Sequence, residues 1–258
     1  YVYVGYRPAG NPSGIAFDQI VAAPTDTAAS KFAYPAIVAA GGGRVRLYHL
    51  AHNLASDTCN VWVWDASDSA DLSDLNSWTL ASRQALSVAL DESGSAAGRI
   101  RVARSGGQYL MTIGAQQYAS ADGIRFDFVG EFTALNPAAV GIGGAGGSFI
   151  VAIDEGGAGD FAIYRLGDAF ARLSAVSPSF TVPSGGGSSG DSVCVAALDD
   201  GTIYVLAPNP HGLAAFQAAG MFATRDDGLT WSLAGYPFTG LANGPRELVI
   251  TGYRDRLY

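Results

Sequence analysis

The chain has 258 residues and a net charge of −8 at pH 7, with 15 lysine and arginine residues against 23 aspartate and glutamate residues. With a single lysine, Lys31, it lacks the clustered basic side chains that neutralise phosphates, so we exclude a nucleic-acid-binding surface. No run approaches the roughly 18 consecutive apolar residues of a membrane helix, so we predict no membrane span. Charged residues make up 15% of the chain, against about 25% in typical domains, which predicts extensive burial in large sheets or in a larger assembly.

Short runs of β-branched and aromatic residues recur along the chain and predict β-strands. A strand at 1–6 opens the chain and leads into a hairpin that ends at Phe17. Four longer segments then repeat the order strand, glycine turn, strand and hairpin, and each predicts a four-stranded sheet: 34–80, 99–129, 139–176 and 192–234. The chain finishes with a strand at 247–252 and a turn into 256–258.

The first strand of three of these segments is rich in alanine and glycine, namely 37–40, 140–143 and 195–197. Small side chains allow neighbouring backbones to approach closely. We therefore predict that these first strands lie where the sheets crowd together.

The clearest local motif is TRDDGLTW at 224–231. The motif begins with the hydroxyl of Thr224. Asp226 can accept hydrogen bonds from nearby backbone N–H groups, and Gly228 can adopt a positive φ. Trp231 can fill the space beneath the turn. A copy one residue shorter keeps the hydroxyl, the carboxylate, the glycine and the ring: Ser120, Asp122, Gly123 and Phe126.

Three weaker copies keep the aromatic residue, and two of these also keep the glycine. With the two clear copies, the aromatic residues of the series are Phe17, Trp78, Phe126, Phe170 and Trp231. The steps between them are 61, 48, 44 and 61 residues, and wrapping from 231 through the end of the chain back to 17 gives 44. Spacings of about 40 to 50 residues are typical of four-stranded propeller blades.

The motif resembles the Asp-box, or BNR repeat, of sialidase-like β-propellers. The resemblance implies an all-β propeller of four-stranded antiparallel blades, with the N- and C-terminal half-blades paired into a fifth blade that closes the ring. We expect a single β-propeller domain over 1–258, excised from a longer polypeptide; a fragment of a propeller with six or more blades is the alternative. In this family the box lies at the outer rim of a blade, so the residues of both copies are expected to be structural.

Ligands of sialidase-like propellers bind at the axial mouth, between the loops that join the second strand to the third and one blade to the next. Sialidases with Asp-boxes use an arginine triad, a tyrosine activated by a glutamate, and an aspartate acid/base, and no ordered set of these can be assembled here. The weak catalytic candidates are Asp154, Glu155, Arg246 and Glu247. The weak ligand-binding candidates are Arg99, Gln116, Gln117, Asn209, His211 and Tyr236, and the amides are expected to be exposed.

Asp65, Asp68, Asp71 and Asp74 recur every three residues. They lack the tight D-x-D-x-D-G spacing of calcium-binding loops, and such residues also cap short helical turns. We predict no metal site and no cofactor.

The two cysteines and two of the histidines are expected to be structural. His49 and His52 lie near the end of a predicted strand, three residues apart, a spacing that does not converge on one metal. Cys59 and Cys194 fall in non-neighbouring segments, too far apart for a disulfide, which predicts two free buried thiols.

Our leading hypothesis is a non-catalytic recognition or adhesion propeller that binds glycans or a host surface. The expected setting is a larger extracellular or virion assembly of the phage tail or fibre type, with neighbouring domains or subunits as partners. One alternative is a glycoside hydrolase of sialidase-like architecture, which is the enzyme class expected if the chain is catalytic. The second alternative is a purely structural subunit of a virion or appendage.

Overall fold

The computed structural model describes residues 2–6, 16–21, 30–53, 58–72, 74–86, 100–114, 116–131, 140–145, 147–154, 161–166, 172–176, 194–198, 200–208, 218–226, 230–239, 252–253 and 256–257. Within these ranges the chain forms twenty β-strands and one short 3-10 helix, η1 (Leu75–Ser77). Among these residues, no helix has both the length and the apolar character that crossing a bilayer requires.

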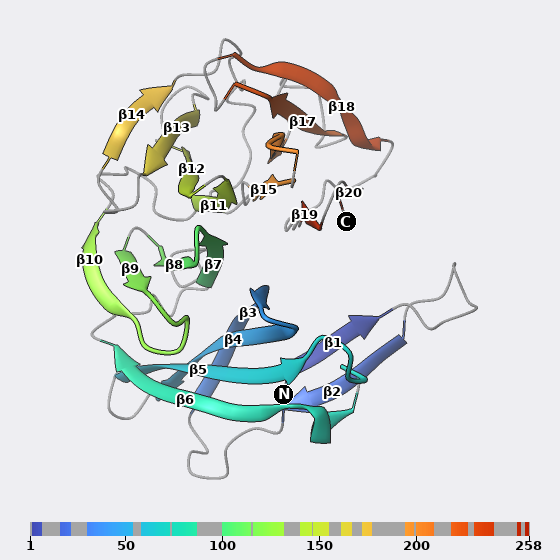
Figure 1. The fold of residues 1–258 in the computed structure, drawn as a ribbon, viewed down its shortest axis with the longest axis vertical. Helices are drawn as coiled ribbons and strands as arrows, with labels where there is room; N and C mark the ends of the chain where they lie inside the picture. Colours follow the sequence, from blue (N-terminus) through green and yellow to red (C-terminus); the bar gives the residue numbers. More distant parts are fainter. Residues whose placement is uncertain are drawn as a thin grey trace. The chain divides into compact units, whose positions relative to one another are not determined.

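Four four-stranded antiparallel sheets, each built from consecutive strands, confirm the prediction from the repeated segments (Figure 1). The first contains β3 (Ser30–Gly41), β4 (Arg44–Asn53), β5 (Thr58–Ser67) and β6 (Thr79–Leu86). The second contains β7 (Ile100–Ser105), β8 (Gln108–Ile113), β9 (Gln116–Ser120) and β10 (Asp127–Glu131). The third contains β11 (Val140–Ala145), β12 (Ser148–Asp154), β13 (Phe161–Leu166) and β14 (Arg172–Val176). The fourth contains β15 (Cys194–Ala197), β16 (Ile203–Pro208), β17 (Ala218–Thr224) and β18 (Ser232–Thr239).

The remaining strands form two antiparallel pairs. One pair is β1 (Val2–Tyr6) with β2 (Ala16–Val21), and the other is β19 (Gly252–Tyr253) with β20 (Arg256–Leu257). Both agree with strands expected near the two ends of the chain, although most of the strand predicted at 247–252 lies outside the described residues. Their joining into a fifth sheet stays a prediction.

The chain divides into two compact units. The first comprises residues 1–90 together with 123–125, and therefore holds β1 to β6 and η1. The second comprises 91–122 and 126–258, and holds β7 to β20. The predicted single domain over 1–258 stays a prediction.

In the first unit, both faces of the sheet formed by β3 to β6 carry buried side chains. Leu47, Ala66 and Trp78 form a cluster on one face. Tyr48, Leu50 and Val63 alternate with those residues along the strands and are fully buried. Burial on both faces explains why β5 carries four consecutive apolar residues at 61–64.

In the second unit, the first strands of three sheets pack together, with β11 between β7 and β15. A Cβ added at Gly144 would overlap the backbone oxygen of Arg104, and a Cβ at Gly143 would lie 2.7 Å from Val195. The turn after β11 is also bonded to the last residue of β7, because the N–H of Gly147 donates to Oγ of Ser105 at 3.0 Å. The prediction that small residues mark a crowded first strand is therefore confirmed for 140–143 and its contact with 195–197.

Candidate functional site

The turn between β17 and β18 is organised around one carboxylate. Oδ1 of Asp226 accepts hydrogen bonds from the hydroxyl of Thr224 at 2.7 Å and from the backbone N–H of Thr230 at 2.9 Å, and Oδ2 accepts from the hydroxyl of Thr230 at 2.5 Å. The predicted hydrogen-bonding role of Asp226 is therefore confirmed. Gly228 lies outside the described residues.

These bonds stabilise the ionised carboxylate. The hydroxyl and the N–H of Thr230, followed by the hydroxyl of Thr224, lower the pKa of Asp226 to about 2. The backbone N–H of Thr202, which donates to Oδ1 of Asp200 at 2.8 Å, and the positive charge of Arg225 lower the pKa of Asp200 in the neighbouring turn. Both carboxylates are therefore charged at neutral pH.

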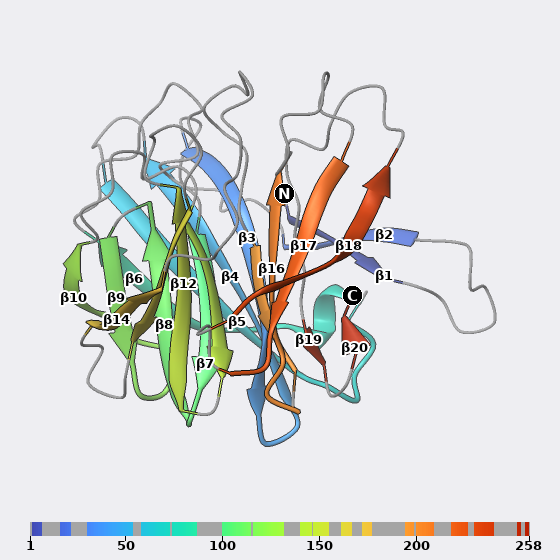
Figure 2. The same ribbon diagram turned by 90° about the horizontal axis from the view of Figure 1, so that it is seen from above.

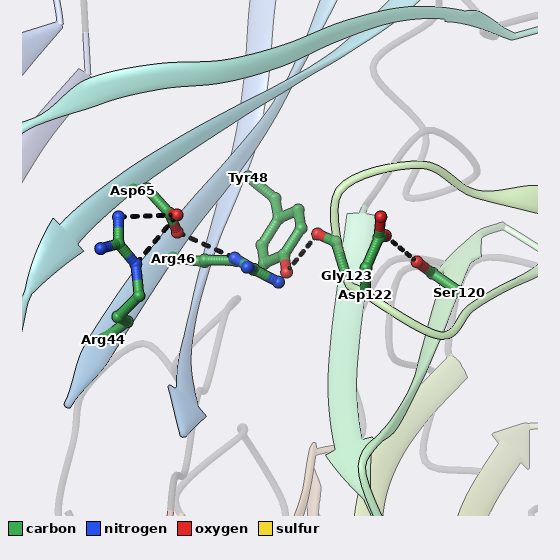
Figure 3. Close-up of polar contacts among 7 residues, drawn as sticks. All are labelled: Arg44, Arg46, Tyr48, Asp65, Ser120, Asp122 and Gly123. Carbon is green, nitrogen blue, oxygen red and sulfur yellow. Dashed lines mark hydrogen bonds and ion pairs between the residues drawn. The ribbon is translucent and has the colours of Figure 1, made fainter. Parts of the chain in front are cut away.

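The turn between β9 and β10 repeats part of this arrangement. The hydroxyl of Ser120 donates to Oδ1 of Asp122 at 2.9 Å, Gly123 has a φ of 70°, and the ring of Phe126 is buried. Residues 123–125 belong to the first unit, where the hydroxyl of Tyr48 donates to the carbonyl oxygen of Gly123 at 2.9 Å (Figure 3). This turn thus carries both the predicted local contact and a contact to β4 that sequence reasoning missed.

The weakest copy, before Trp78, uses different bonds. Asp74 accepts hydrogen bonds from the backbone N–H and the side-chain amide of Asn76 at 2.9 and 3.0 Å. The ring of Trp78 is buried, and its Nε1–H donates to the carbonyl oxygen of Leu72 at 3.0 Å. The carboxylate and the ring are kept, although no glycine is present.

A shallow depression of about 390 Å³ lies beside the turn between β17 and β18. It is lined by two aromatic residues, a cation and several hydroxyl groups: Thr202, Tyr204, Ala223, Thr224, Arg225, Thr230, Trp231 and Ser232. The sequence assigned Trp231 and Thr224 to the turn alone, and nothing in the spacing of the motif indicated a hollow next to it.

A second group of polar and aromatic side chains lies on β9 and β10. The hydroxyl of Tyr118 donates to Oε1 of Gln116 at 2.7 Å, and Nε2 of Gln116 donates to Oε1 of Glu131 at 3.1 Å. The ring of Phe128 meets that of Tyr118 edge to face, with centroids 5.7 Å apart, and is 57% exposed. We call Gln116, Tyr118, Phe128 and Glu131 the β9–β10 patch.

Of the predicted ligand-binding residues, Gln116 belongs to this patch. Gln117 is 8% exposed and pairs with Thr112 across the strands, so the expectation of an exposed amide is wrong there. The side chain of Gln117 lies on the face of β9 opposite to that of Gln116, because successive residues of a strand point to opposite sides.

Most of the other predicted site residues cannot be placed. Arg99, Glu155, Asn209, His211, Arg246 and Glu247 lie outside the described residues. Asp154 ends β12 and Tyr236 lies within β18, but the surroundings of their side chains also lie outside the description.

The first carboxylate of the aspartate series forms ion pairs. Asp65 forms ion pairs with Arg44 and Arg46, and the shortest distance from a guanidinium nitrogen to a carboxylate oxygen is 2.8 Å in each pair (Figure 3). Asp74 caps a turn, as the alternative to calcium binding predicted. Among the described residues, no three histidine, cysteine, aspartate or glutamate side chains group as metal ligands.

His49 lies within β4 rather than near its end and is buried. Its ring stacks on Trp62 and Trp64 of β5, with centroids 5.8 and 6.4 Å away, and the guanidinium of Arg83 lies 5.1 Å from the ring of Trp62. Burial lowers the pKa of His49 to about 4, so the ring is neutral at pH 7. The expectation of an ordinary strand-end histidine was wrong for His49, because cross-strand pairing places it opposite Trp62.

Cys59 is a free buried thiol, as predicted, and burial raises its pKa to about 12. The thiol is therefore protonated and unreactive at neutral pH. Cys194 is the first residue of β15, and the surroundings of its side chain lie outside the description.

No protein-family model and no curated protein matches the chain. In structure it is similar to a protein of unknown function from Dyadobacter fermentans, with a TM-score of 0.49 and 10% identity over 86% of this chain and 72% of that one. It is similar to the Trypanosoma rangeli sialidase, whose structure holds sialic acid, with a TM-score of 0.44 and 15% identity over 90% of this chain and 40% of that one. It is also similar to the β-propeller domain of the Trilobed protease from Pyrococcus furiosus, with a TM-score of 0.42 and 9% identity over 80% of this chain and 58% of that one. The chain spans less than two thirds of the length of the sialidase and of the protease domain.

Proposed function

We propose that the chain is a non-catalytic recognition propeller that binds glycans through side chains at the ends of its sheets. The proposed setting is a larger extracellular or virion-surface assembly, in which neighbouring domains or subunits cover part of a surface that is poor in charge. The observation that carries the proposal is the β9–β10 patch.

The proposed scaffold is a closed ring. Four sheets of consecutive strands support a propeller, and so does the packing, in the second unit, of first strands that are rich in small residues. The hydrogen bonds of Asp226 and Asp122 support the proposal that both turns are related to the Asp-box. Pairing of the β1–β2 hairpin with β19–β20 would complete a fifth blade and leave no open sheet edge.

The β9–β10 patch has the chemistry of a sugar-binding surface. The exposed ring of Phe128 offers an apolar face, held in place by its edge-to-face contact with the buried Tyr118. Next to it, the bonds of Gln116 to Tyr118 and Glu131 fix an amide and a carboxylate in one orientation. Preorganised groups of this kind lose little entropy when a ligand binds.

Three of the described carboxylates, Asp65, Asp122 and Asp226, have structural partners, which supports the proposal of recognition rather than hydrolysis. Glycoside hydrolysis requires one carboxyl group that keeps its proton near neutral pH and a second one that is ionised. Asp226, with its pKa of about 2, cannot hold a proton at that pH. Asp65 forms ion pairs with two arginines, and Asp122 accepts the hydroxyl of Ser120, so both carboxylates have structural partners.

A glycan array with the whole chain tests this proposal, followed by titration of each positive glycan against Gln116→Ala and Phe128→Ala. We expect at least one glycan to bind, and each substitution to weaken binding by about tenfold or more, since aromatic and amide contacts dominate such small interfaces. Leu233→Ala is the matched control, because Leu233 is an exposed apolar residue of another outer strand. The proposal fails if no glycan binds, or if the control weakens binding as much as Phe128→Ala does.

A further inference from the structure

The depression beside the β17–β18 turn exists because a small residue occupies the centre of a cross-strand row. The strands β16, β17 and β18 are neighbours in the fourth sheet (Figure 2). Tyr204 of β16, Ala223 of β17 and Ser232 of β18 are paired in register across it. Paired residues project from the same face of a sheet. The methyl group of Ala223 fills little of the space between its two neighbours, so the row has a hollow at its middle.

The walls of this hollow combine apolar rings with hydrogen-bonding groups. The half-buried rings of Tyr204 and Trp231 line it together with the exposed side chain of Arg225. Hydroxyl groups of Thr202, Thr224, Thr230 and Ser232 complete the lining. The volume of about 390 Å³ lies in the range of roughly 300 to 1,000 Å³ that small-molecule sites occupy.

Two of the hydroxyl groups have their protons directed away from a ligand. Thr230 donates its proton to Asp226, so its exposed oxygen can accept a hydrogen bond from a ligand. Thr224 also donates to Asp226, and its oxygen accepts the backbone N–H of Asp226 at 3.3 Å. Arg225 supplies donors in a planar array. The site thus offers acceptors and donors beside aromatic faces, a combination that suits a polyhydroxylated ring with one apolar face.

The charges around the depression favour a neutral ligand. Arg225 is the one cation among the lining residues, and its charge already stabilises the carboxylate of Asp200. Asp226 is ionised and lies in the adjoining turn. An anionic ligand would meet two carboxylates against one guanidinium, so the net electrostatic term does not favour it.

We propose that this depression is a binding site for a neutral pyranose unit, separate from the β9–β10 patch. The sugar stacks an apolar face on Tyr204 or Trp231, lies over Ala223, and exchanges hydrogen bonds with Arg225 and the threonine hydroxyls. A turn whose carboxylate is structural would then also frame a ligand site.

Two substitutions test the site without removing the turn. Ala223→Leu fills the hollow, and Arg225→Met removes the donors while keeping a similar length of side chain. The probes are methyl β-galactoside, N-acetylglucosamine and glucuronic acid, titrated into labelled protein while backbone amide shifts are followed by NMR. We expect at least one of the two neutral sugars to shift the amides of Thr230 to Ser232, and both substitutions to weaken that binding by about tenfold.

Arg125→Met is the matched control for Arg225→Met, and it leaves this binding unchanged because Arg125 is an exposed arginine that lies neither in the lining of the depression nor in the β9–β10 patch. Thermal unfolding of each variant shows whether it is folded; if Ala223→Leu is not, Arg225→Met with Tyr204→Ala decides. The inference is overturned if neither neutral sugar shifts these amides, if glucuronic acid binds more tightly than both, or if the folded variants bind as the parent does. Since array binding at the β9–β10 patch depends on Gln116, the two proposals can fail independently.

Discussion

Among the described glycines of the second unit, Gly144 has little room for a side chain. A Cβ at this position would overlap the backbone oxygen of Arg104, and a backbone atom cannot rotate away as a flexible side chain can. We expect Gly144→Ala to lower the free energy of unfolding by about 3 kcal/mol or more, as severe overpacking does. Urea denaturation measures the loss.

A glycine with open surroundings provides the comparison. Gly201 has a φ of 83°, and a Cβ added there would meet nothing within 4 Å, so only its backbone conformation is demanding. Because asparagine tolerates this left-handed region, Gly201→Asn should cost less than about 1 kcal/mol. Equal losses at both positions would contradict the packing described for β7 and β11.

His49 predicts a pH dependence of stability. Its pKa is about 4 in the folded chain and about 6.5 when unfolded, so below pH 6.5 the unfolded chain binds a proton that the folded chain does not. Stability should therefore fall between pH 6.5 and 4, by up to about 3 kcal/mol, and level off below the folded pKa.

Urea denaturation of the parent and of His49→Phe at a series of pH values measures this dependence. Phenylalanine keeps a ring against Trp62 and removes the titrating group, so the loss between pH 6.5 and 4 should shrink in the variant. The contribution of Asp226 is lost mainly below pH 4, between an unfolded pKa of about 3.9 and a folded pKa of about 2, so it overlaps this range only at its lower end. A variant that loses as much stability as the parent over this range would exclude His49 as the cause.

At the scale of elements, a buried hydroxyl of β4 contributes to holding the turn residues 123–125. Tyr48 is fully buried and donates to the carbonyl oxygen of Gly123. Tyr48→Phe removes the donor and leaves this carbonyl without that bond, which should cost about 1 to 2 kcal/mol. Tyr204→Phe, at a half-buried residue of the fourth sheet, is the control and should change stability by less than about 0.5 kcal/mol. A loss for Tyr48→Phe no larger than that of the control would contradict a stabilising role for this bond.

The sheets and the turn chemistry could be predicted because they depend on local patterns. Strand runs, turn glycines and the spacing from Thr224 to Asp226 are all visible within a few residues. The burial of His49 could not be predicted, since it depends on the register that sets β4 against β5. The ion pairs of Asp65 and the hollow over Ala223 likewise depend on residues that are distant in sequence and meet only through strand pairing.

At the scale of the whole molecule, the proposed ring makes the two ends of the chain depend on each other. If the β1–β2 hairpin completes a blade with β19–β20, removing residues 1–21 exposes a sheet edge and apolar surface on both sides of the missing half-blade. We expect the truncated chain to unfold at a temperature several degrees lower and to aggregate more readily, as thermal unfolding followed with light scattering would show. Unchanged unfolding would exclude the closed ring.

The proposed function requires the chain to recognise a glycan without cleaving it. Proton NMR of a glycan that binds on the array, incubated with a stoichiometric amount of protein, tests this most directly, because the anomeric signals report both binding and hydrolysis. We predict broadened signals of bound glycan and no new anomeric signal of a released sugar. Steady release of a free reducing sugar by the purified chain would contradict the claim and establish a glycoside hydrolase instead.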